Sequence, residues 1–180
     1  MARRNLNIIL SGFGGQGLLF AGKIIAQAGL IEDRQVSWLP SYGPEMRGGT
    51  ANCSVVLSDD PIGSPLVTAP DALIAMNQPS VTKFMPAVKP GGLVLADASL
   101  VPDIPEREDV EVFAIPSTAL AEENGFKTLS NVILTGKLWA QTEFCARETL
   151  EAAVEKVVPA KKRERFLQPN LDALHLGMEQ

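Results

Sequence analysis

The stretch Asn5–Leu30 reads NLNIILSGFGGQGLLFAGKIIAQAGL and decides the fold of this chain. Residues 5–11 form a short apolar run of the kind found in buried strands, and residues 18–30 are rich in Ala, Ile and Leu at helical spacing. The loop between them, Gly12–Gly17, holds four glycines. A strand that runs through a glycine loop into a helix is typical of the opening unit of an α/β fold.

Short apolar runs further along the chain predict the other strands. They are residues 35–39, which Pro40 ends, and residues 51–57, 72–76, 93–96 and the weaker 110–115. Residues 131–158 show a helical pattern that Pro159 closes. Strands that alternate with helices imply right-handed crossovers and helices on both faces of the sheet. We therefore predict an α/β fold, a three-layer α/β/α sandwich with a mostly parallel sheet.

The bulk composition favours a single domain over residues 1–180. With 180 residues, 46% of them hydrophobic, the chain can enclose one sizeable core but is short for two. The segment from about residue 159 is expected to form a C-terminal helical tail. No apolar run approaches the roughly 20 residues needed to cross a bilayer, and no signal-peptide core follows Arg3 and Arg4. We expect no membrane span and a cytoplasmic location.

The scarcity of metal-binding side chains excludes several kinds of site. Cys53 and Cys145 lie far apart without C-x-x-C spacing, and His175 is the single histidine. Neither a zinc site nor an iron–sulfur cluster can be built from these residues alone, so we interpret both cysteines as buried small hydrophobes. A net charge of −5 disfavours nucleic-acid binding. The one basic run, Lys161–Arg165, is interpreted as a solvated helix face or tail.

The glycine loop fits the pattern G-x-G-x-x-G through Gly12, Gly14 and Gly17. At a strand-to-helix corner such a loop can present N–H groups to an anion, or can serve only to pack the helix closely on the sheet. Both interpretations stay open. A dinucleotide site also needs an acidic residue at the end of the second strand, but Pro40 ends that strand and Glu32 and Asp33 precede it. Autonomous NAD or FAD binding is therefore disfavoured.

A second loop, residues 41–50, reads SYGPEMRGGT and has the composition of a shaped binding loop. Gly48 and Gly49 can bring backbone amides close to a ligand or partner. Arg47 can grip a carboxylate or a phosphate in bidentate fashion. The alternative is an internal Glu45–Arg47 pair that only orders the loop.

The two loops together make the sequence recognisable. Gly12–Gly17, Ser41–Gly49, Val55-Val56 and Ser58–Ile62 resemble, in order and spacing, the γ subunit or fused γ domain of the 2-oxoacid:ferredoxin oxidoreductases. The resemblance covers residues 5 to about 145 and is greatest to the 2-oxoglutarate (KorC-like) branch, although the pyruvate, branched-chain oxoacid and indolepyruvate branches share much of it. It implies the fold of domain III of pyruvate:ferredoxin oxidoreductase.

The resemblance also implies a division of labour within a larger complex. Partner subunits, namely α, β and a ferredoxin-like δ subunit, would hold thiamine diphosphate, magnesium and iron–sulfur clusters. The complex would decarboxylate a 2-oxoacid oxidatively to an acyl-CoA and pass two electrons to ferredoxin. This chain would hold no cofactor, no metal and no catalytic residue. Its expected contribution is a ligand or partner surface near CoA and the oxoacid, formed by Gly12, Gly14, Gly15, Gln16, Gly17, Tyr42, Glu45, Arg47, Gly48 and Gly49.

Two other classes of function stay open on the sequence. An autonomous dinucleotide-dependent oxidoreductase rests on the glycine loop alone, and bound nicotinamide or flavin in the purified chain would indicate it. A plain scaffold would hold the catalytic subunits in register without touching a ligand. In that case, substitutions in the loops would alter assembly but not the substrate constants.

Overall fold

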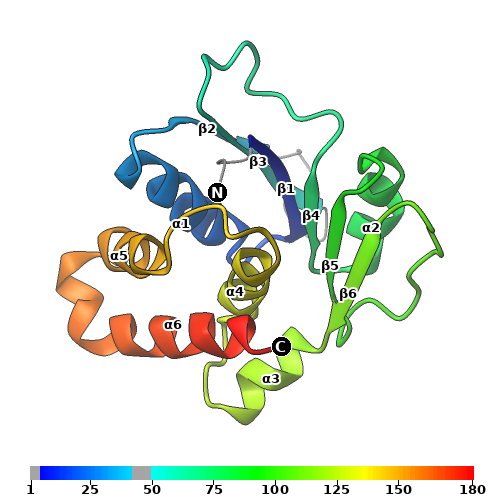
Figure 1. Cartoon of the computed structure of the whole chain (residues 1–180). Coiled ribbons are helices and arrows are strands. Elements are labelled where there is room, and N and C mark those ends of the chain that lie inside the picture. Colours follow the sequence, from blue (N-terminus) through cyan, green and yellow to red (C-terminus); the bar gives the residue numbers. More distant parts are fainter. Residues whose placement is uncertain (1–4, 42–49) are drawn as a thin grey trace.

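The computed structural model of the chain describes residues 5–41 and 50–180 (Figure 1). Its strands are β1 (Leu6–Phe13), β2 (Gln35–Ser41), β3 (Thr50–Ser58), β4 (Ala72–Ala75), β5 (Leu93–Asp97) and β6 (Glu111–Ile115). Its α-helices are α1 (Leu18–Ile31), α2 (Gln78–Phe84), α3 (Ser117–Glu123), α4 (Ser130–Thr142), α5 (Arg147–Val157) and α6 (Arg163–Met178). Two short 3₁₀ turns, η1 (Met85–Ala87) and η2 (Ala160–Lys162), precede β5 and α6.

The strands form one mixed sheet in the order β2-β3-β1-β4-β5-β6. β1, β4, β5 and β6 pair in parallel, and β3 runs antiparallel to both β1 and β2. β3 thus runs opposite to the other five strands of the described sheet. The predicted α/β sandwich is confirmed, and the sheet is mixed because of β3.

Pro40 does not end the second strand as predicted. β2 continues through Pro40 to Ser41, with Pro40 opposite Cys53 of β3. Because β2 lies at the edge of the sheet, a residue without an N–H can remain in the strand at little cost in ladder hydrogen bonds.

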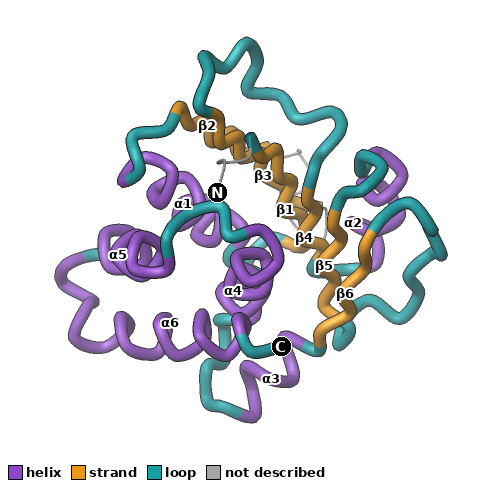
Figure 2. The backbone as a smooth tube through the Cα atoms, in the orientation of Figure 1, coloured by secondary structure: helices purple, strands orange, loops and turns teal. Residues whose placement is uncertain are grey.

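Helices lie on both faces of the sheet (Figure 2), and apolar side chains pack between the sheet and each helical layer. Ile8 and Leu10 of β1 belong to the core beneath α1, α4, α5 and α6, whereas Ile9 belongs to a second core with Val81 of α2 and Val94 of β5. A strand buried on both sides needs a continuous apolar run rather than alternation, which is the pattern in β1.

The predicted helical stretch 131–158 is two helices rather than one. α4 ends at Thr142, its C-cap Glu143 has a left-handed φ of 43°, and α5 begins after Ala146. The turn between them is anchored to the segment after α1, since the Ala146 N–H donates to Glu32 Oε1 at 2.7 Å and Arg34 Nη1 donates to the Phe144 carbonyl at 3.3 Å. These contacts between residues more than 100 positions apart explain why periodicity alone missed the break.

The C-terminal segment packs as part of the helical layer. Leu174 of α6 is fully buried against α4, and His175 Nε2 lies 2.7 Å from Glu151 Oε1 of α5. Gly136 of α4 and Gly177 of α6 let the two helices cross with backbone against backbone. None of the helices described is long and apolar enough to cross a membrane.

Both cysteines are buried, as predicted, and burial governs their chemistry. Loss of hydration raises the pKa of the Cys53 thiol to about 12. It also raises the pKa of Cys145 to about 12, with a further increase from the charge of Glu32 and a partial offset by Arg34. The folded chain therefore keeps both thiols protonated where an unfolded chain, with the ordinary value of 9.0, would ionise them.

Neither thiol is expected to react with a disulfide reagent such as DTNB at pH 8 until the chain unfolds. Because thiols of the unfolded chain lose their protons at a lower pH than those of the folded chain, the free energy of unfolding is unaffected below pH 9. It falls as the pH rises from 9 toward 12. Thiol titration with and without denaturant, together with unfolding curves between pH 8 and pH 11, measures both effects. Rapid labelling of the native chain at pH 8 would contradict this account.

Candidate functional site

The glycine loop lies at the carboxyl end of β1, where the strand turns into α1. Gly15 and Gly17 have left-handed φ values of 96° and 76°, so a side chain would be strained at either position. A Cβ on Gly17 would also lie 2.6 Å from Asn131 Nδ2. At Gly12 a side chain is excluded by its neighbours, because a Cβ there would collide with the side chains of Gln16 and Met76.

Gln16 closes the loop through its side-chain amide. The Phe13 N–H donates to Gln16 Oε1 at 2.6 Å, and Gln16 Nε2 donates to the Met76 carbonyl at 3.0 Å. Gln16 thereby ties the end of β1 to the end of β4, a contact across 60 positions of sequence. The structure gives it a positioning role in the loop.

Replacing Gln16 by Ala is expected to lower the free energy of unfolding by about 1–2 kcal/mol, because two hydrogen bonds are lost and the Phe13 N–H loses its acceptor. Gln27→Ala on α1 is the matched control, since Gln27 is half-buried and its substitution leaves the loop intact. Chemical denaturation of both variants measures the difference. Equal stability of the two variants would show that the clamp contributes nothing.

The start of α1 is joined to the start of α4. Gly17 is the N-cap of α1 and supplies no side-chain cap, and Asn131 Nδ2 donates to its carbonyl oxygen at 2.9 Å. This bond places the glycine loop beside α4, more than 110 residues later in the chain.

The two ends of the second loop, Ser41 and Thr50, lie at the same end of the sheet as the glycine loop. Phe13 of β1 pairs with Thr50 of β3, and Ser41 of β2 pairs with Asn52. The chain therefore leaves and re-enters the sheet beside the end of β1. The predicted site residues Tyr42, Glu45, Arg47, Gly48 and Gly49 lie outside the described residues.

A row of buried polar side chains follows the carboxyl ends of the parallel strands. Ser11 Oγ of β1 lies 2.8 Å from Ser80 Oγ, and Asn77 Oδ1 accepts from the Ser80 N–H at 2.9 Å. Asp97 of β5 is fully buried and accepts three hydrogen bonds from Ser99 and Thr118. These contacts hold the connections after β4 and β5, so we interpret the row as structural.

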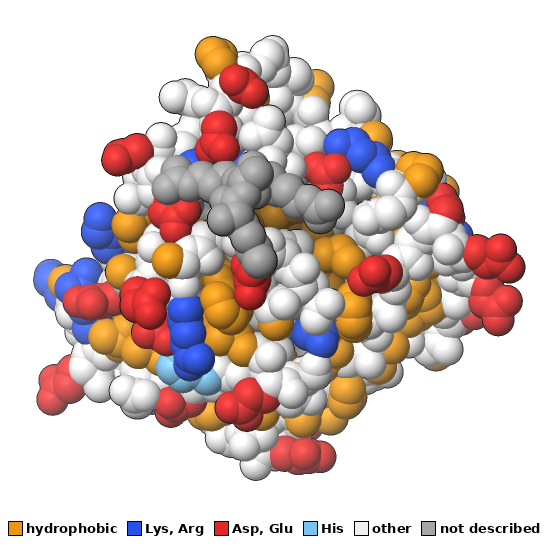
Figure 3. Space-filling view, in the orientation of Figure 1, with side chains coloured by type: hydrophobic (Ala, Val, Ile, Leu, Met, Phe, Trp, Pro, Cys, Tyr) orange, Lys and Arg blue, Asp and Glu red, His pale blue; other side chains and the backbone are white. Residues whose placement is uncertain are grey.

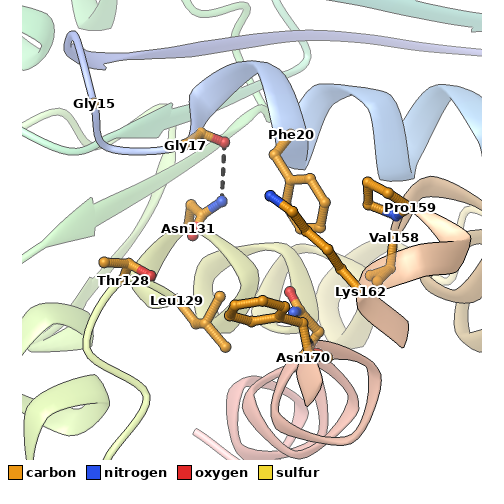
Figure 4. Close-up of a pocket in the computed structure, with 11 residues that line it drawn as sticks. Gly15, Gly17, Phe20, Thr128, Leu129, Asn131, Val158, Pro159, Lys162 and Asn170 are labelled. Carbon is orange, nitrogen blue, oxygen red and sulfur yellow. Dashed lines mark hydrogen bonds between the residues drawn. The ribbon is translucent and has the colours of Figure 1, made fainter. Parts of the chain in front are cut away.

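A cavity of about 480 Å³ lies within the helical layer, next to the glycine loop (Figure 4). We call it the helix-layer cavity. Four segments line it: the glycine loop and α1, the start of α4, the chain around η2, and α6. Its residues are Gly15, Gly17, Phe20, Thr128, Leu129, Asn131, Val158, Pro159, Lys162, Phe166 and Asn170.

Of the predicted site residues that the structure describes, Gly15 and Gly17 line the helix-layer cavity. The other lining residues were not predicted from the sequence. Lys162, of the basic run interpreted as a solvated face, is exposed and also lines the cavity. On the face drawn in Figure 3, basic side chains are scattered among acidic ones rather than gathered. Within residues 5–41 and 50–180, no group of three or more His, Cys, Asp or Glu side chains could hold a metal ion.

Two curated relatives resemble the chain over most of its length. Ketoisovalerate oxidoreductase subunit VorA of Methanothermobacter marburgensis is 42% identical over 137 residues, which is 76% of this chain but 28% of that subunit. The chain thus spans less than a third of that longer relative. 2-Oxoglutarate synthase subunit KorC of Methanocaldococcus jannaschii is 38% identical over 175 residues, covering 96% of this chain and 91% of that subunit.

Solved structures agree with these relatives. The γ subunit of keto/oxoacid ferredoxin oxidoreductase from Geobacter sulfurreducens is 34% identical with a TM-score of 0.85, over 98% of this chain and 95% of that one. The 2-oxoglutarate:ferredoxin oxidoreductase of Magnetococcus marinus, with 2-oxoglutarate, coenzyme A and succinyl-CoA bound, is 25% identical with a TM-score of 0.86, over 98% of this chain and 31% of that one.

The similarity extends beyond the part of the sequence where it was expected. The predicted resemblance ended near residue 145, whereas the family model described as pyruvate ferredoxin/flavodoxin oxidoreductase matches residues 7–180, including α5 and α6. With this match and the relatives above, the resemblance is confirmed: the chain belongs to the pyruvate ferredoxin/flavodoxin oxidoreductase family.

Proposed function

We propose that this chain is the γ subunit of a 2-oxoglutarate:ferredoxin oxidoreductase. The observation that carries the proposal is its end-to-end correspondence with a KorC subunit, since the alignment takes in nearly all of both chains. The complex would convert 2-oxoglutarate, CoA and two oxidised ferredoxins into succinyl-CoA, CO₂, two reduced ferredoxins and a proton. We assign this reaction to the cytoplasm.

The cofactors of this reaction belong, in the proposal, to α, β and δ subunits. Thiamine diphosphate with magnesium supplies the carbanion chemistry of decarboxylation, and iron–sulfur clusters carry the electrons to ferredoxin. This chain contributes binding and orientation at the interface. Gly14, Gly15 and Gly17 present backbone N–H groups at the start of α1, and Arg47 supplies a cation for a CoA phosphate or the oxoacid carboxylate.

The shared edge of the two loops supports this arrangement. Ser41 and Thr50, the first and last residues of the second loop, lie at the same end of the sheet as Phe13. Open α/β sheets bind ligands at the carboxyl ends of their parallel strands, and the glycine loop follows such an end.

Arg47→Ala in the assembled enzyme is expected to raise the KM for CoA or the oxoacid about tenfold or more, because one charge-assisted hydrogen bond contributes roughly 1.5–3 kcal/mol. Arg147→Ala is the matched control, since Arg147 is exposed on α5 and pairs only with Glu151 among the described contacts. Steady-state kinetics with each substrate varied in turn measures the effect. If Arg47→Ala leaves both KM values unchanged but impairs subunit assembly, Arg47 does not bind a substrate and the loop acts as a scaffold.

A branched-chain oxoacid is the second candidate substrate. It is favoured by the 42% identity to a ketoisovalerate oxidoreductase subunit, although that identity applies to part of a longer chain. The substrate pocket in either case would lie mainly in partner subunits.

The deciding experiment is anoxic purification of the chain with its native partners. The eluate is assayed for thiamine diphosphate, iron and CoA-dependent reduction of a viologen dye with 2-oxoglutarate, 3-methyl-2-oxobutanoate, pyruvate and indolepyruvate. Preference for 2-oxoglutarate supports the proposal, and preference for 3-methyl-2-oxobutanoate supports the second candidate. A single chain that carries nicotinamide or flavin would overturn both.

A further inference from the structure

The helix-layer cavity has a mainly apolar wall that includes an exposed aromatic ring. Phe20 of α1, Leu129 at the start of α4 and Val158 at the end of α5 line it. Phe166 of α6 lines it as well, with 40% of its surface exposed. A concave apolar wall around a volume of about 480 Å³ can take one or two large side chains of another molecule.

The charged residues at this cavity are all basic. Among the described residues that line it, Lys162 alone is charged. The charged residues that directly adjoin a lining residue in sequence are Lys127, Lys161, Arg163 and Arg165. Acidic residues outnumber basic ones in the whole chain, 21 to 16, so the absence of an acid from all these positions departs from the composition. The cavity is therefore suited to a partner that carries negative charge.

Three of these cations are available to a partner. Lys161, Lys162 and Arg165, which we call the basic rim, are exposed, and none of the described ion pairs involves them. Figure 4 shows the Lys162 side chain reaching from η2 across the cavity toward the side of Asn131. Arg165 Cζ lies 5.1 Å from the centroid of the Phe166 ring. The exposed aromatic ring and the cations thus belong to one continuous surface.

The extent of the basic rim favours a polypeptide over a small molecule. Lys161 and Arg165 are not among the described residues that line the cavity, so a molecule confined to the cavity would leave them unused. A polypeptide can place one side chain in the cavity and carboxylates on either side of it. An apolar pocket beside a charged rim is the usual anatomy of a protein–protein contact. A second copy of this chain fits less well, because a twofold contact through this surface would bring the two basic rims together.

We propose that the helix-layer cavity and the basic rim bind an acidic segment of a partner subunit. One large apolar or aromatic side chain of that segment enters the cavity against Phe20 and Phe166. Asp or Glu side chains beside it pair with the basic rim. The inference rests on the proposed function only for the existence of partner subunits, and it is independent of the oxoacid and of the glycine loop.

Acetylation of lysines measures whether a partner covers the basic rim. The complex, purified without oxygen together with its native partners, and the isolated chain are treated with the N-hydroxysuccinimide ester of acetic acid. Mass spectrometry then gives the rate at each lysine relative to a free reference peptide. Lys161 and Lys162 are expected to react about tenfold more slowly in the complex, because a buried, paired amine is shielded from the reagent. Equal rates in the two samples would overturn the proposal.

Carbodiimide cross-linking of the same complex identifies what covers the basic rim, because it joins an amine only to a carboxylate in contact with it. Lys161 or Lys162 is expected to be joined to an Asp or Glu of a partner subunit, next to a large apolar residue. Cross-links to a second copy of this chain, recognised by mixing labelled and unlabelled copies, would contradict the proposal. Cross-links that reach no partner subunit would contradict it as well.

Two charge reversals form a matched pair of variants. Lys162 and Lys83 are both exposed, and Lys83 lies on α2, which packs on the other face of the sheet. Lys162→Glu is expected to lower the affinity of the chain for the complex about tenfold at low ionic strength, since it sets like charges against each other. Lys83→Glu is the control for the change in net charge. Wild-type retention of Lys162→Glu in the complex would rule out the ion pairs.

Phe166→Ala separates the apolar contact from the charges. Its loss of affinity is expected to be the same at low and high ionic strength, whereas that of Lys162→Glu shrinks as salt screens the charges. If Phe166→Ala binds the complex as tightly as the wild-type chain, no side chain of a partner enters the cavity. None of these measurements requires turnover. Absence of partner subunits from the purified material would remove the proposed function, whereas partners present with freely reactive lysines would remove only this docking surface.

Discussion

Gly177→Ala is expected to lower the free energy of unfolding by about 3 kcal/mol, an effect at the upper end of overpacking substitutions. A Cβ on Gly177 would overlap the carbonyl group of Ile133 on α4, and a Cβ on Gly136 would overlap the carbonyl group of Leu174 on α6. Each helix thus places a glycine against the backbone of the other. Backbone atoms cannot rotate away as a side chain can, so the helices must separate.

The intrinsic helix propensities work in the opposite direction. Alanine is favoured over glycine in a helix interior by about 1 kcal/mol, so a net loss of stability must come from the contact between α4 and α6. Gly63→Ala is the control, because a Cβ there has no neighbour within 4 Å and its φ is not left-handed. Urea denaturation of both variants measures the effect. A Gly177→Ala chain as stable as the Gly63→Ala chain would refute the close crossing.

Asp97→Ala is the second substitution expected to have a large effect, a loss of about 3 kcal/mol. Asp97 Oδ1 accepts from the Ser99 and Thr118 N–H groups at 3.1 and 3.3 Å, and Oδ2 accepts from Thr118 Oγ1 at 2.5 Å. Alanine leaves these donors without their acceptor, the fully buried Asp97 carboxylate, where β5 ends and α3 begins. The connection after β5 and the first turn of α3 are expected to loosen together.

Asp97→Asn separates hydrogen bonding from side-chain truncation. The asparagine oxygen can still accept from the two backbone N–H groups, and its NH₂ can donate to the Thr118 hydroxyl, so a loss of about 1 kcal/mol is expected. Thermal unfolding and amide hydrogen exchange at Ser99 and Thr118 distinguish the two variants. If Asp97→Ala costs no more than Asp97→Asn, the buried carboxylate does not hold this edge of the sheet.

The sequence was sufficient to predict the elements whose signal is local. The apolar run in β1, the glycine loop and the periodicity of α1 depend on residues close together in sequence, and the structure has them where they were predicted. The family was predicted from two loop motifs, Gly12–Gly17 and Ser41–Gly49, that occur in this order and at the expected spacing. The α4–α5 break was missed because Arg34 and Glu32 fix it from a distant segment.

The candidate site was less predictable from the sequence, because its contacts join residues that are far apart along the chain. Gln16 is recognisable in a loop motif, but its bond to Met76 is tertiary. Asn131 and Asn170 lie within helices, where a polar residue usually faces water, and only the packing of α1, α4 and α6 buries them. Lys162 belongs to a basic run that has the composition of a solvated face.

The position of β1 in the sheet has a consequence for synthesis on the ribosome. Of the strands described, β1 is made before the others and lies inside the sheet, with β3 on one side and β4, β5 and β6 added in turn on the other. No strand has to be inserted between two that are already paired, so the sheet can grow outward as the chain emerges. The helices α4, α5 and α6, which cover one face together with α1, are made last. Until residues 130–178 have left the exit tunnel, the nascent chain exposes this apolar face, and chaperones that bind hydrophobic segments are expected to act in that interval.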